Sequence, residues 1–219
     1  MLAPRGDVAG DPQQTKGKAS LARLHAALGV ALGGYVVFHV WQQWPVLLGR
    51  DAWLDRAMHA ALPQALKLVL AAVVIAHVLL GALRLRASAH PADTAIDAGL
   101  RRVQLFFGAL TLLFLAIHLP LVRWTPGPAS TVLDVHERLT HELGRPGMMA
   151  AHLVGLTAVC AHLGLGLGRG AVSLGLVSQP RWLYYVGGLL AGILLLCWLQ
   201  VLAVYAIGEP LIPALAPLP

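Results

Sequence analysis

The stretch LARLHAALGVALGGYVVFHVWQQWPVL, residues 21–47, is the first of the long apolar runs that decide the fold of this chain. It exceeds the roughly 20 residues that a helix needs to cross the hydrocarbon core of a bilayer. His39 nonetheless lies in its last third, although a histidine without a partner is costly in hydrocarbon. The stretch therefore predicts a transmembrane helix that holds a histidine for a specific partner.

The composition of the whole chain indicates an integral membrane protein. Of its 219 residues, 58% are hydrophobic and 12% are charged, whereas a soluble domain carries about 25% charged residues. The net charge of +6 comes from Lys and Arg scattered between apolar runs, so we expect no nucleic-acid partner. Cys160 and Cys197 both lie within apolar runs, which argues against a disulfide framework.

Five apolar runs are long enough to span the lipid bilayer as helices. They cover about residues 21–47, 62–85, 101–122, 147–168 and 181–207. Gly and Pro at the junctions are ordinary helix terminators. We predict an all-α membrane protein with a polar, disordered N-terminal tail (1–20), a five-helix transmembrane domain (21–207) and a Pro-rich C-terminal tail (208–219).

The basic residues predict the orientation of the chain. With the N-terminus inside, ten Lys and Arg lie on the inner side and six on the outer side, and cytoplasmic loops normally carry the excess. Four tryptophans then lie at the outer boundary, where an aromatic belt is expected: Trp41, Trp44, Trp53 and Trp124. We therefore expect a cytoplasmic N-terminus.

Four histidines lie within the first four runs, one in each: His39, His77, His118 and His162. Counted from the nearest inner arginine, His39 and His118 are each sixteen residues away, and His77 and His162 are each seven away. At 1.5 Å per residue these offsets correspond to depths of about 24 Å and about 10 Å. The four histidines thus form two pairs at two levels, although helix-packing histidines bonded to backbone groups remain an alternative.

Two imidazoles that face each other across a bundle favour haem as the partner. Zinc needs four N or S ligands at one point, whereas haem supplies four equatorial nitrogens and takes two axial ligands. We predict two bis-histidine haems stacked across the membrane inside a bundle of the first four helices. Because both axial positions are filled, the expected task is electron transfer.

Other histidines have different predicted roles. On an ideal helix His25 lies about 40° from His39 and at the inner end. There it could hydrogen-bond a propionate of the inner haem, with Arg23 and Arg169 as charge partners; a solvated interfacial histidine is the alternative. We expect the remaining loop histidines to lie on the surface: His59, His90, His136 and His141.

The sequence resembles the five-helix dihaem cytochrome b membrane anchor of succinate:quinone oxidoreductases and fumarate reductases. The resemblance covers nearly all of residues 21–207 and rests on RLHAALGV (23–30), FHVWQQW (38–44), AHVLLGALRL (76–85), LRRVQLFFGALTLLFLAIHLPLVRW (100–124) and CAHLGLGLGRGAVSLGLVSQPRW (160–182). It implies that His39 and His118 ligate the iron of an outer haem b, and that His77 and His162 ligate that of an inner one.

The resemblance also implies partners and a location. The partners would be a flavoprotein and an iron–sulfur subunit on the cytoplasmic face of a bacterial inner membrane. Electrons would pass between the iron–sulfur subunit and a membrane quinone, commonly menaquinone. We expect the quinone near the outer haem, because its carbonyls need a hydrogen-bond donor and its ring an aromatic wall. The candidates are Trp41, Gln42, Trp44, His59, Arg123 and His152.

Two alternatives stay open. One is the cytochrome b anchor of another quinone-linked oxidoreductase, although such families often place two ligands on one helix, whereas here each ligand has its own. The other is a haem-free transporter or scaffold, in which the histidines relay protons or pack helices. A reduced-minus-oxidised spectrum separates these possibilities, because only a cytochrome shows b-type haem.

Overall fold

The chain is helical throughout the part that the structure describes. This computed structural model describes residues 12–59, 62–87, 95–123, 132–178 and 181–213. The long helices are α1 (Pro12–Gln43), α3 (Gln64–Ala87), α4 (Ala95–Arg123), α6 (Pro146–Ser173) and α7 (Arg181–Ile207). The short ones are the 3₁₀ helix η1 (Trp44–Leu48), α2 (Arg50–His59) and α5 (Val132–Leu143). Within these ranges there is no β-strand, and the predicted all-α class is confirmed.

All five long helices are long and apolar enough to cross a membrane, as predicted. The spans are Ala19–Leu48, Gln64–Arg84, Ala98–Leu121, Pro146–Ser173 and Arg181–Ile207. The fourth span continues past its predicted end at residue 168, and a Cβ at Gly168 would lie 3.0 Å from the ring of Tyr184. The turn comes later, at Gly175, whose positive φ of 75° suits a residue without a side chain.

Two expectations for the segments outside the spans are wrong. Residues 12–20, expected in a disordered tail, belong to α1, which begins at Pro12; proline is well suited to the first turn of a helix. The segments after the first and third spans contain the helices α2 and α5 rather than loops alone. Helix α5 places Val135, Leu139 and Leu143 against the core, and this burial of one apolar side stabilises it.

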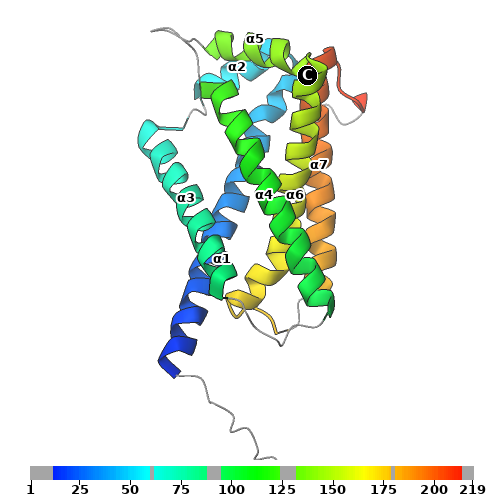
Figure 1. Cartoon of the computed structure of the whole chain (residues 1–219). Helices are drawn as coiled ribbons and strands as arrows, with labels where there is room; N and C mark the ends of the chain where they lie inside the picture. The colour runs from blue at the N-terminus through cyan, green and yellow to red at the C-terminus, as the bar shows by residue number, and fades with distance from the viewer. Residues whose placement is uncertain (1–11, 60–61, 88–94, 124–131, 179–180, 214–219) are drawn as a thin grey trace, which may run out of the picture.

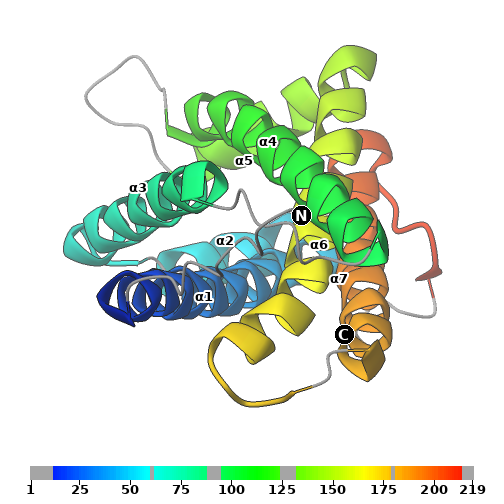
Figure 2. The same ribbon diagram turned by 60° about the horizontal axis from the view of Figure 1, so that its bottom comes forward.

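The spanning helices form an open ring with α7 on its flank. Around the ring, α3 packs on α1, α1 packs on α6, and α6 packs on α4, whereas α3 and α4 do not pack on each other within the described residues. Figure 2, turned by 60° from the view of Figure 1, shows α3 beside α1. Helix α7 packs along α6. The ring order therefore makes α1 and α4 one diagonal, and α3 and α6 the other.

Helices α2 and α5 lie across one end of the bundle, which we call the capped end (Figure 1). Gly49, with φ of 106°, turns the chain from η1 into α2. Buried Trp53 of α2 donates its indole N–H to Gln43 Oε1 at 2.9 Å, and buried Tyr205 of α7 donates its hydroxyl to the same oxygen at 3.2 Å. The side-chain oxygen of Gln43 thus connects α2 and α7 to the end of α1 through two hydrogen bonds.

Candidate functional site

The four intramembrane histidines lie together in the pairs expected from their depths. The rings of His39 on α1 and His118 on α4 have centroids 6.2 Å apart and planes at 74°. The rings of His77 on α3 and His162 on α6 have centroids 6.3 Å apart and planes at 87°. We call these the outer pair and the inner pair, the outer pair being nearer the capped end. Their role as ligands stays a prediction.

Each pair spans a diagonal of the helix ring. Helices α1 and α4 do not pack against each other, nor do α3 and α6, in the part of the chain that the structure describes. The imidazoles nevertheless reach toward each other across the interior. Facing side chains from separate helices are the way in which helical bundles build cofactor sites in their cores.

The inner pair is oriented by main-chain carbonyl groups. His77 Nδ1 lies 3.2 Å from the carbonyl oxygen of His25, and His162 Nδ1 lies 3.0 Å from that of Gln104. A carbonyl can only accept, so in both rings Nδ1 donates and Nε2 carries the free lone pair. This is the arrangement found around metal-ligating histidines, whose second nitrogen donates to an acceptor that fixes the ring.

The outer pair is oriented by side chains. His118 Nδ1 lies 3.5 Å from His152 Nε2, and His152 Nδ1 lies 2.9 Å from the carbonyl oxygen of Met148. His39 is hydrogen-bonded to the side chain of Gln42. Gln42 and His152, two of the residues expected at a quinone site near the outer haem, each contact a ring of the outer pair; their role toward a quinone stays a prediction.

Two glycines make room for the inner rings. A Cβ at Gly29 would lie 3.1 Å from His77 Cε1, and a Cβ at Gly108 would lie 3.0 Å from His162 Cε1. Both distances are tighter than ordinary carbon contacts, so a larger residue would push the imidazole away. The positions of the inner rings therefore depend on their hydrogen bonds and on the space that these two glycines leave.

A cationic group lies beside the inner pair. The ring of His25 stacks on that of His77, with centroids 4.1 Å apart, and Arg84 Nη1 donates to His25 Nδ1 at 3.1 Å. Arg169 is also close enough to act electrostatically on His25, whereas Arg23 is exposed. Arg84, which sets the depth of His77 in the sequence, was not predicted as a partner of His25, although its spacing of seven residues places it on the same helix face as His77.

A buried hydrogen-bond donor next to the outer pair has no partner. Trp198 of α7 is 7% exposed, and its ring lies 5.4 Å from that of His39. Within the described residues, its Nε1 is one of two buried side-chain polar atoms without a hydrogen bond; the other is the hydroxyl oxygen of Thr111. Thr111 precedes His118 by seven residues, on the same face of α4. Buried polar side-chain atoms without a partner are rare in folded proteins.

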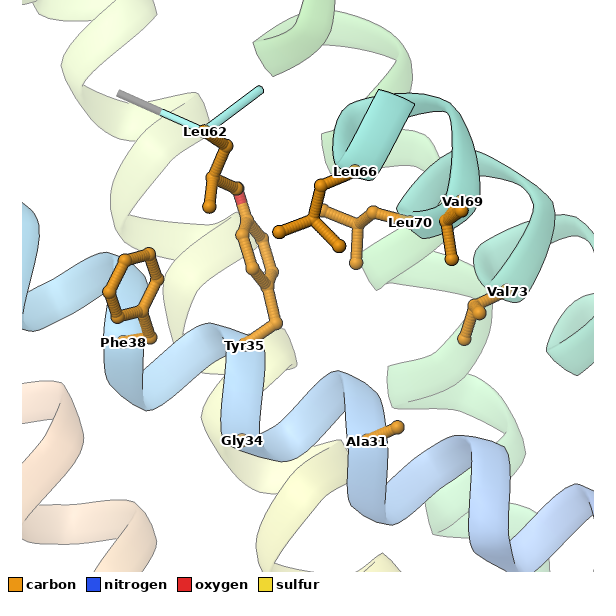
Figure 3. Close-up of a pocket in the computed structure, with 9 residues that line it drawn as sticks. All are labelled: Ala31, Gly34, Tyr35, Phe38, Leu62, Leu66, Val69, Leu70 and Val73. Carbon is orange, nitrogen blue, oxygen red and sulfur yellow. The ribbon is translucent and has the colours of Figure 1, made fainter. Parts of the chain in front are cut away.

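An apolar cavity of about 410 Å³ lies between α1 and α3. Figure 3 shows the Tyr35 ring reaching from α1 toward Leu62 and Leu66. The same ring stacks on His39, with centroids 5.7 Å apart and planes at 8°. Gly34 also lines the cavity, and a Cβ there would meet nothing within 4 Å. The cavity is open to the outside, since Leu66 and Val69 in its lining are exposed, and it adjoins the outer pair through Tyr35.

Three other predicted quinone residues have separate neighbours within the described part of the chain. Trp41 is half exposed, and the Arg56 guanidinium lies 4.2 Å from the centre of its ring. Exposed His59 lies 3.2 Å from the carboxylate of Asp55, and Trp44 packs against the core at the start of η1. The side chain of Arg123, like Trp124 and His90, lies outside the described residues.

His136 was expected in a surface loop, and this prediction is wrong. It lies on α5, half buried, with its ring 5.2 Å from that of Trp53 and 5.5 Å from that of Tyr205. Burial and the nearby Arg50 guanidinium lower the pKa of His136, and Glu137 opposes them. His136 comes next to Val135, on the side of α5 that packs inward. Its inward placement therefore depends on helix α5, which was not predicted. His141 is exposed, as predicted.

No group of three or more His, Cys, Asp or Glu side chains able to hold a metal ion occurs in the described part of the chain. No family model, curated protein or solved structure matches this chain.

Proposed function

We propose that this chain is the membrane-anchor cytochrome b subunit of a succinate:quinone oxidoreductase or fumarate reductase. It would pass electrons between an iron–sulfur subunit and a membrane quinone through two bis-histidine b haems. The observation that carries the proposal is that four histidines form two facing imidazole pairs, one on each diagonal of the helix ring.

The spacing within each pair fits a shared metal ion. A metal–imidazole bond measures about 2 Å, so two imidazoles on opposite sides of one ion have ring centres about 6 Å apart. The observed separations are 6.2 Å and 6.3 Å. Two ligands at each level suit haem, which needs only two from the protein, and bound haem would supply one-electron transfer.

The surroundings of the pairs support the same assignment. Nδ1 of His77, His118 and His162 is directed at an acceptor, which leaves Nε2 for iron. The apolar cavity beside Tyr35 would accept part of the outer macrocycle. Arg84 and Arg169 would supply the positive charge, and His25 a hydrogen-bonding imidazole, to hold the propionates of the inner haem, with Arg23 at the surface of that end.

Topology and partners follow from the same proposal. The excess of basic residues favours a cytoplasmic N-terminus in a bacterial inner membrane. The inner pair would then face a flavoprotein and an iron–sulfur subunit on the cytoplasmic side. The outer pair would lie near the quinone, with menaquinone as the expected species, at the capped end.

The test is a reduced-minus-oxidised spectrum of the full chain purified from membranes. We expect b-type haem at two per chain, and co-purification of a flavoprotein and an iron–sulfur protein from mild detergent. A purified chain that is folded and binds no haem would overturn the proposal in favour of a transporter or scaffold. Two haems with a different oxidoreductase partner would retain the electron-transfer role and reject the succinate or fumarate assignment.

A further inference from the structure

The imidazole of His152 is placed to control one ring of the outer pair. Its Nδ1 lies 2.9 Å from the Met148 carbonyl oxygen, one turn earlier on α6. Because a carbonyl only accepts, Nδ1 of His152 carries the hydrogen and Nε2 is an acceptor. The neighbouring His118 Nδ1, 3.5 Å from that acceptor, is therefore the donor. The chain of hydrogen bonds runs in one direction, from His118 through His152 to Met148.

The orientation of His152 is fixed by packing as well as by hydrogen bonds. The residue is 3% exposed. The ring of Phe114 meets His152 edge-on, at 5.3 Å and 88°, and lies 5.2 Å from the ring of His118. Phe114 in turn fills the space left by Gly155, where any Cβ would collide with it. The three rings are thus held as one unit between α4 and α6.

We propose that His152 is a positioning residue for His118: it fixes the tautomer and orientation of this ligand and thereby sets the reduction potential of the outer haem. The inference rests on the proposed function and names a new role for this side chain. With both ring nitrogens engaged and almost no exposed surface, His152 is unsuited to bind the quinone for which it was a candidate.

The outer and inner sites differ in a way that experiment can use. His77 and His162 donate to main-chain carbonyls, which no side-chain substitution removes. His118 donates to a side chain, which a substitution does remove. An acceptor on the second nitrogen makes an imidazole a stronger donor to its metal, and this favours oxidised iron. Loss of the acceptor should therefore raise the potential of the outer haem alone.

The experiment compares His152→Leu, His152→Gln and Cys160→Ala in the full chain purified with its haem. Leucine removes the acceptor, whereas the side-chain oxygen of glutamine can replace Nε2. Cys160, which is 2% exposed on the same helix, controls for altered packing. The measurements are a redox titration and the low-spin electron paramagnetic resonance signals of both haems.

We expect His152→Leu to favour the reduced outer haem by about tenfold, equivalent to an upward shift of about 59 mV for a one-electron couple. The inner haem should be unchanged in all variants, and His152→Gln should restore most of the outer potential. If His152→Leu fails to assemble, His152→Asn serves, because its side chain is too short to reach His118. Two haems with unchanged outer potential and signals in the variants would reject the positioning role and leave the proposed function intact. Absence of haem from the unmodified chain would reject both.

Discussion

The rings of His77 and His162 lie 6.3 Å apart, centroid to centroid, although α3 and α6 do not pack against each other. Helix α3 is the least enclosed of the spanning helices: none of its span is buried inside the protein. It packs on α1 alone among the described elements. A group bound by both imidazoles would therefore connect α3 to the rest of the bundle, and the cofactor would contribute to the fold as well as to electron transfer.

Single replacement of one histidine from each pair should separate the two sites. We expect His77→Ala to remove the inner haem and His118→Ala to remove the outer one, so that each variant keeps about one of two haems. The check is haem content per chain together with a redox titration, in which the surviving component should differ between the variants. His59→Ala, at an exposed position, should keep both. If both substitutions abolished the same component, the pairing at two levels would be wrong.

Filling the cavity at Gly34 should affect the outer site selectively. The Gly34→Phe side chain would enter the space beside Tyr35, which stacks on His39. We expect loss of the outer haem signal while the inner signal remains, as measured by the spectrum of the purified chain. Gly192→Phe is the matched control, because Gly192 is exposed on α7 and also has nothing within 4 Å. An unchanged outer signal in Gly34→Phe would show that the cavity lies outside the haem site.

The sequence was sufficient to predict which histidines lie at one level. All spanning helices cross the same apolar slab, so an offset from an interfacial arginine translates directly into depth. The same offsets say nothing about the order of helices around the ring. That order decides which side chains of different helices face each other, and it places His152 of α6 against His118 of α4.

The helices at the capped end were missed for a different reason. Hydropathy averaged over a bilayer-length window does not detect a helix of only ten or twelve residues. The side chains of Val135, Leu139 and Leu143 recur every four residues in α5, so the helical period was present. The burial of His136 could not have been read from it, because its neighbours Trp53 and Tyr205 come from distant parts of the chain.

The contact between α6 and α7 should tolerate no side chain at Gly164. A Cβ there would lie 2.6 Å from the Gly187 carbonyl oxygen and 2.9 Å from Ala191 Cβ. Overpacking of this kind costs about 1–3 kcal/mol, so we expect Gly164→Ala to lower the midpoint of thermal unfolding in detergent. Gly192→Ala meets open space and should leave the midpoint unchanged or raise it, since alanine favours helix by up to about 1 kcal/mol. Equal midpoints for the two variants would contradict close packing at Gly164.

Removal of the Gln43 amide should loosen the capped end. Its oxygen accepts from Trp53 and from Tyr205, and both donors are buried. Each donor left without a partner costs about 1–3 kcal/mol, so Gln43→Leu should lower thermal stability and speed proteolysis of α2. Exposed Gln64 at the start of α3 provides the control: Gln64→Leu should change neither quantity. A Gln43→Leu chain as stable as the control would show that the two hydrogen bonds contribute little.

The docking of α5 should weaken in acid because of His136. Burial and Arg50 hold its pKa below the ordinary value of 6.5, while Glu137 acts in the opposite direction. The docked form thus binds fewer protons than the undocked one, so this contribution to stability is complete above pH 6.5 and is lost as the pH falls. Hydrogen–deuterium exchange of α5, corrected for intrinsic rates, should rise from pH 8 to about pH 5 in the unmodified chain. His136→Gln should show a smaller rise, whereas His141→Gln, at an exposed position, should behave like the unmodified chain. The same pH dependence in all three would mean that another group controls the docking of α5.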